Sequence, residues 1–123
     1  MLTLDTNILI YYAAGDKRIS DFLIQNLAEN TPLFLPTVVV LEFFSFPGLA
    51  SREQALFKTI LPQLHIVVFD FDLSLAAADL RKTYRMKLGD SVVAATAIDN
   101  NSTLVTRNVR DFKKVSDLKL LDL

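Results

Sequence analysis

Short apolar runs separated by longer amphipathic stretches constrain the fold of this chain most strongly. Helical spacing of apolar residues is found over residues 16–29, 52–61 and 72–86. Alternating strands and helices predict an α/β fold with a central parallel sheet of about five short strands flanked by helices. The expected strands are Leu2–Leu4, Leu33–Leu35, Ile66–Phe69, Thr103–Thr106 and, more weakly, Lys119–Leu121. At 123 residues, the chain predicts a single domain over residues 1–123.

Composition excludes several kinds of site. The chain has no cysteine, so disulfides and thiolate chemistry are impossible. With a single His it also has few of the ligands that zinc sites use. No apolar run approaches the roughly 18 residues that span a bilayer, and no secretory signal is recognisable. We therefore expect a soluble, cytoplasmic protein with no membrane partner.

Two helix assignments are less direct. Pro36–Phe46 contains three consecutive valines that favour a strand, but its length and the following Pro-Gly favour a helix, which we predict. A helix from Asp72, which is suited to capping, should run to Met86, with Gly89 separating it from a more apolar helix that ends near Asn100.

Three carboxylates lie in sequence that otherwise resembles protein core. Asp5 ends the first strand, Glu42 lies within the apolar helix, and Asp90 begins the helix of small apolar residues. Each has an ordinary alternative: Asp5 as a helix cap, Glu42 as the mark of a solvent-facing side, and Asp90 as a favourable charge at a helix N-terminus. A parallel sheet can nevertheless gather all three at one edge, because ligands bind beyond the carboxyl ends of its strands.

Several carboxylates close together repel one another unless a cation compensates them. Oxygen ligands favour Mg²⁺ or Mn²⁺, and such a cation can activate water against a phosphodiester. Residues 81–114 carry eight of the thirteen basic side chains against three acids, so this segment could hold a polyanion, although two solvated helix faces explain it equally well. Metal-assisted phosphodiester hydrolysis is the predicted reaction class.

The order of these motifs resembles PIN-domain ribonucleases, in particular VapC-type toxins of toxin–antitoxin pairs. The resemblance spans essentially the whole chain and rests on four motifs: Leu4-Asp5-Thr6-Asn7, Glu42 in its helix, Gly89 to Ala97, and Leu104 to Phe112. It implies a PIN-like three-layer fold, a Mg²⁺-dependent endoribonuclease, an RNA substrate, a cognate antitoxin and a homodimer.

The resemblance also implies roles for individual residues. Asp5, Asp90 and Glu42 would bind the metal, Glu42 alternatively orienting the attacking water. Small polar neighbours would orient the acids: Thr6, Asn7 and Thr106. Charge distribution adds possible RNA contacts: Arg107, Arg110, Lys82 and Arg85.

One position departs from the family. Many relatives have an Asp where this chain has Asn108, and Asp111 follows one helical turn later. An Asn can ligate through its carbonyl but adds no charge, so Asn108 and Asp111 together are predicted to complete the catalytic site. Asp111 could instead be a surface residue paired with Lys114 or Arg107.

Two other functions remain open from the sequence. A PIN-fold module that only binds a partner would explain Asn108. A receiver-like domain would use Asp70, at the end of a predicted strand, as a phosphoacceptor, but it needs a pair of acids after the first strand and a Lys after a late strand, which Thr6, Asn7 and Arg107 do not provide.

Overall fold

The computed structural model describes residues 1–123 and contains one five-stranded sheet. All neighbouring strands are parallel, in the order β3-β2-β1-β4-β5. The strands are β1 (Leu2–Leu4), β2 (Leu33–Pro36), β3 (His65–Val67), β4 (Thr103–Thr106) and β5 (Leu120–Asp122). The predicted parallel α/β sheet is confirmed.

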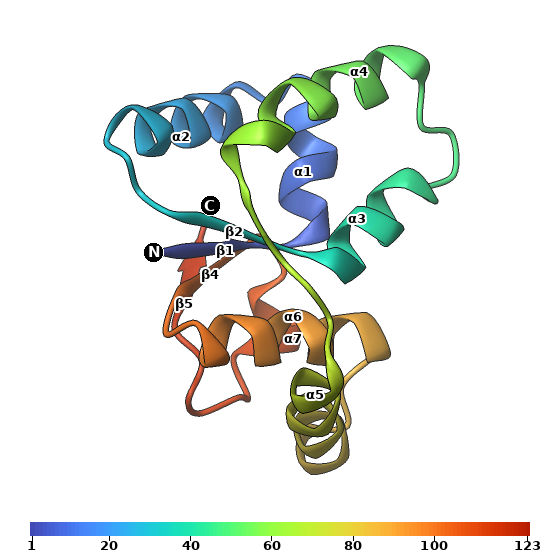
Figure 1. Ribbon diagram of the computed structural model, residues 1–123, viewed down its shortest axis with the longest axis vertical. Helices are drawn as coiled ribbons and strands as arrows, with labels where there is room; N and C mark the ends of the chain where they lie inside the picture. The colour runs from blue at the N-terminus through green and yellow to red at the C-terminus, as the bar shows by residue number, and fades with distance from the viewer.

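Helices cover both faces of the sheet and give three layers (Figure 1). The helices α1, α2 and α4 lie on one side, α6 lies on the other with α5 packed against it, and α3 follows the end of β2. Their bounds are α1 (Thr6–Ala13), α2 (Lys17–Ala28), α3 (Thr37–Phe44), α4 (Ser51–Ile60), a 3₁₀ turn η1 (Leu61–Gln63), α5 (Phe71–Tyr84), α6 (Leu88–Asp99) and α7 (Val109–Phe112). None of these helices combines the length and the hydropathy that a membrane crossing requires.

The central strands are apolar because helices bury both of their faces. Leu4, Leu35 and Leu104 are fully buried, and all seven residues from Ser91 to Ala97 of α6 are buried. The small side chains of α6 let this helix lie close to the sheet. The first turn of α6, with Asp90, is thereby held beside the strand ends.

Several predicted boundaries were wrong in detail. Asp70, not Asp72, caps α5, because its Oδ1 accepts a hydrogen bond from the Leu73 amide at 2.9 Å. Gly89 lies inside the first turn of α6 rather than between two helices. The helix break falls instead at Arg85, whose left-handed backbone (φ +53°) ends α5. The predicted helix over 36–46 exists, but Pro36 closes β2 and α3 starts at Thr37.

Candidate functional site

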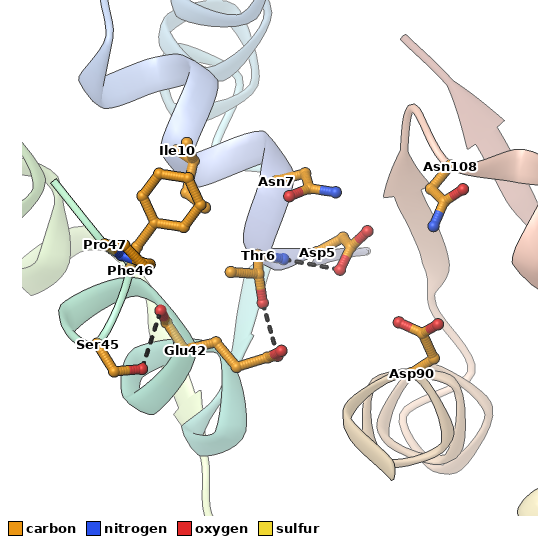
Figure 2. A pocket seen from close by; sticks show the side chains of 10 residues that line it. All are labelled: Asp5, Thr6, Asn7, Ile10, Glu42, Ser45, Phe46, Pro47, Asp90 and Asn108. Carbon is orange, nitrogen blue, oxygen red and sulfur yellow. Dashed lines mark hydrogen bonds between the residues drawn. The ribbon is translucent and has the colours of Figure 1, made fainter. Parts of the chain in front are cut away.

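A pocket of about 320 Å³ opens at the carboxyl ends of the central strands. Figure 2 shows side chains from four segments around it: the start of α1, α3 with the loop after it, the first turn of α6, and the loop after β4. Three of the lining residues are the carboxylates expected from the sequence. The ten lining residues are Asp5, Thr6, Asn7, Ile10, Glu42, Ser45, Phe46, Pro47, Asp90 and Asn108.

Asp5 is a buried carboxylate, 5% exposed, that also caps α1. Its Oδ1 accepts from the Thr6 amide at 2.8 Å, and its Oδ2 accepts from the Thr106 hydroxyl at 2.9 Å. Burial raises the pKa of Asp5 to about 6; these hydrogen bonds oppose the rise, and the charges of Asp90 and Glu42 add to it. Asp5 thus both caps α1 and lines the pocket, and its negative charge is only partly compensated.

Glu42 extends into the pocket from α3, and a hydrogen bond holds its carboxylate. The Thr6 hydroxyl donates to Glu42 Oε1 at 2.8 Å, as Figure 2 shows. A Cβ built on Gly89 would lie 3.0 Å from Glu42 Oε2 and 3.2 Å from its carboxyl carbon. The carboxylate of Glu42 therefore lies against the first turn of α6, where a side chain at position 89 would force it to shift by a few tenths of an ångström.

Asp90 faces the pocket from α6 (Figure 2). Burial raises the pKa of its carboxyl; the charges of Asp111 and Glu42 act in the same direction, and Lys87 and Lys114 act against it. Asp111 does not line the pocket, but Asn108 Nδ2 donates to Asp111 Oδ2 at 2.6 Å. Asn108 and Asp111 thus form one unit beside Asp90.

Thr106 connects two sides of the site. The backbone amide of Asn108 donates to the Thr106 hydroxyl at 2.9 Å, and that hydroxyl donates in turn to Asp5 Oδ2. Thr6 and Thr106 each contact an acid, as expected for orienting residues, whereas Asn7 lines the pocket without a side-chain hydrogen bond to an acid.

Comparison with known proteins agrees with this arrangement. A family model described as the PIN domain matches residues 2–118. The chain belongs to the PIN-domain family. Ribonuclease VapC2 of Rickettsia felis is 29% identical over 127 residues, which cover 95% of this chain and 93% of that protein. The predicted family is confirmed.

Solved structures share the PIN fold over nearly the whole chain. The VapBC2 complex of Rickettsia felis, bound to a promoter DNA fragment, matches with a TM-score of 0.85 and 24% identity, covering 99% of this chain and 98% of that one. A toxin–antitoxin complex from Klebsiella pneumoniae matches with a TM-score of 0.80 and 25% identity, covering 98% and 96%. These matches confirm the three-layer fold.

The basic residues predicted to contact RNA differ in whether their charge is paired within this PIN domain. Arg107 pairs with Asp16 at 2.8 Å and lies 4.6 Å from the centre of the Tyr11 ring. Its guanidinium is therefore occupied within the protein. Arg110 is exposed on α7, and Lys82 with Arg85 lines a separate hollow.

Sequence reasoning missed the apolar wall of the pocket. Ile10, Phe46 and Pro47 face it, with Phe46 44% exposed (Figure 2). The Pro47-Gly48 turn, with Gly48 at φ +79°, was the available signal, because it holds the end of α3 in a tight loop beside the acids. Tyr11 and Tyr12, although they belong to α1, do not line this pocket.

The donor set fits a hard divalent cation in kind, and ribonucleases of this family generally depend on divalent metals. The buried, incompletely compensated Asp5 carboxylate is the observation that favours one. No three acidic or His side chains lie close enough together to form a complete cage. Mg²⁺ usually keeps several waters in its protein sites and binds through one or two carboxylates.

The raised pKa of Asp5 predicts a pH-dependent stability of the metal-free protein. Because the native pKa of about 6 exceeds the ordinary 3.8, the native state holds the extra proton, and the Asp5 contribution to stability is lost as pH rises from about 4 through 6. Asp5→Asn should therefore raise the free energy of unfolding at pH 7.5 by up to about 3 kcal/mol. Urea unfolding in EDTA should show this gain shrinking towards pH 4; a gain independent of pH would contradict the assignment.

Proposed function

We propose that this protein is a divalent-metal-dependent endoribonuclease of the VapC type, which hydrolyses RNA phosphodiester bonds and serves as the toxin of a toxin–antitoxin pair. The observation that carries the proposal is the single pocket that Asp5, Glu42 and Asp90 line from three different elements. Membership of the PIN family and the relative named a ribonuclease support the same reaction class. The active unit is the single domain of residues 1–123.

In the proposed reaction, Asp5 and Asp90 would hold Mg²⁺ or Mn²⁺, with Asn108 and Asp111 supporting the Asp90 side. The cation would supply charge stabilisation at the phosphate and would lower the pKa of water. Glu42, fixed by Thr6, orients the attacking water. Water oxygen bonds to phosphorus, the P–O bond to the leaving nucleotide breaks, and the water proton leaves to solvent while the leaving oxygen gains one.

An antitoxin and a second copy of the chain are the proposed partners. Two solved relatives are described as VapBC or toxin–antitoxin complexes. Exposed apolar side chains on and after α3 suit a partner surface, with Leu41 68% and Phe46 44% exposed. The proposal places the protein in the cytoplasm, where RNA is available.

The structure gives the receiver-like alternative no support. Asp70 caps α5 through the Leu73 amide and does not line the acidic pocket. The binding-module alternative differs from the proposal in a single property, which is turnover.

Incubating the purified protein with an end-labelled RNA in Mg²⁺ separates these two functions. We expect fragments that accumulate with time and exceed one product per protein. A protein that binds the RNA and leaves it intact would instead be a binding module.

The contact between Gly89 and Glu42 predicts a separation of activity from stability. Gly89→Ala should lower RNA cleavage about tenfold or more, because the new methyl group displaces the Glu42 carboxylate, while helix stability stays equal or rises by up to about 1 kcal/mol. Cleavage rates and melting temperatures test this. In a Glu42→Ala background the same change should have no further effect on cleavage; a full additional loss would show that Gly89 acts elsewhere.

A further inference from the structure

The last turn of α5 and its connection to α6 carry unpaired positive charge outside the acidic pocket. Arg81, Lys82, Arg85 and Lys87 occur within seven residues that contain no acid. All four are exposed and none forms an ion pair; the two ion pairs of the protein lie elsewhere. Exposed cations without partners are available to a polyanion.

Three of these cations surround a hollow. Arg81, Lys82 and Arg85 line a depression of about 520 Å³ whose remaining walls are Ala78 and Met86. The left-handed residue at Arg85 ends α5 and returns the chain towards α6. The hollow and the first turn of α6 are therefore only a few residues apart along the backbone.

A second basic segment lies against the same helix. The hydroxyls of Tyr84 and Ser116 are 3.3 Å apart and hydrogen-bonded, which ties the end of α5 to the loop between α7 and β5. This loop carries Lys114, which is exposed. Lys87 is the N-cap of α6, and Asp90 lies in the first turn of the same helix.

Together these residues link the hollow to the first turn of α6, which carries Asp90. We name this group the basic track and define it as Arg81, Lys82, Arg85, Lys87 and Lys114. We propose that the sugar–phosphate backbone of the RNA runs along the basic track on one side of the scissile bond. The inference rests on the proposed function and extends it to the path of the substrate.

Two observations favour RNA over an acidic protein segment on this surface. The track begins at Lys87, the N-cap of the helix whose first turn carries Asp90, where the scissile phosphate would lie, and phosphate contacts position the strand whatever its sequence. The hollow has only two apolar lining residues, Ala78 and Met86, whereas protein interfaces depend on buried apolar and aromatic anchors. Arg107 lies outside the track because Asp16 holds it.

The test compares two triple variants of equal charge, both in an Asp5→Asn background so that the RNA stays intact. One is Arg81→Gln/Lys82→Gln/Arg85→Gln. The control removes three exposed cations on α2 and α4, in the other layer: Arg18→Gln/Arg52→Gln/Lys58→Gln. Fluorescence anisotropy measures the binding of two unrelated 20-nucleotide RNAs between 50 and 300 mM salt.

We expect the track variant to bind both RNAs at least tenfold more weakly at low salt. The slope of log K against log salt concentration should become shallower by about 2, since each single-strand phosphate contact contributes about 0.7 to its magnitude. The control should match the parent. Equal slopes in both variants would overturn the inference, as would polyglutamate competing as well as RNA of equal charge, which indicates an acidic protein partner.

Cleavage of the same RNAs by the wild-type protein is measured in parallel. Cleavage with unchanged slopes would refute the basic track and leave the proposed function intact. Altered slopes without cleavage would support the basic track and refute the proposed function.

Discussion

Asp90→Asn should lower the rate of RNA cleavage on the order of a thousandfold. A bound metal contributes several kcal/mol of transition-state stabilisation, and each 1.4 kcal/mol is a factor of ten in rate. Asp90 is a candidate ligand that is free to bind, because its carboxylate has no hydrogen-bond donor within the chain, in contrast to that of Asp5. The amide keeps the shape of the side chain but removes the charge that attracts the cation.

Single-turnover kinetics on an end-labelled RNA measure this effect. Asp99→Asn is the matched control, since Asp99 is exposed at the last residue of the same helix and lies outside the pocket. It should cleave like the wild type. Near wild-type cleavage by Asp90→Asn, with both variants folded by circular dichroism, would remove Asp90 from the catalytic site.

Divalent cations should stabilise the wild-type protein strongly. A ligand at a hundredfold its dissociation constant adds about 2.7 kcal/mol, which corresponds to a rise in melting temperature of roughly 10 °C for a domain of this size. The cation offsets the burial of the Asp5 carboxylate, which raises its pKa, together with the smaller repulsion from Asp90 and Glu42. At pH 5 the rise should be smaller, because the cation must displace the proton from Asp5.

Thermal unfolding in Mg²⁺, in Mn²⁺ and in KCl of equal ionic strength tests the effect. Asp5→Asn should melt higher than the wild type in EDTA and gain little from the cations. A cation-induced rise that is equal in wild type and Asp5→Asn would mean that the cations bind elsewhere.

Hydrophobic periodicity was enough to predict the sheet, since each core strand is short and buried on both faces. The Pro36–Phe46 stretch was resolved correctly as a helix by its length, although three valines favoured a strand. The boundaries at Asp70 and Gly89 could not be predicted, because they depend on which of several polar or small residues meets its tertiary neighbours. Gly89 had looked like a helix stop, and its actual constraint, the Glu42 carboxylate, is 47 residues away in the chain.

The acids of the site were foreseen from their unusual position in apolar sequence, and the structure lines one pocket with Asp5, Glu42 and Asp90. Thr6 and Thr106 were expected to orient the acids, but which acid each of them contacts was not foreseeable from sequence spacing. The hydrogen bond from Thr6 to Glu42 and the pairing of Arg107 with Asp16 both join residues far apart in the chain. Because Arg107 pairs with Asp16, its guanidinium is less available to contact RNA than the exposed cations of the chain.

RNA cleavage by metal-stripped protein, followed as Mn²⁺ or Mg²⁺ is added back, tests the central claim most directly. We predict no cleavage in EDTA, recovery that saturates with the cation in the wild type, and no recovery in Asp5→Asn. Cleavage that survives EDTA, or recovery that is equal in wild type and Asp5→Asn, would contradict a metal-dependent nuclease built on this pocket.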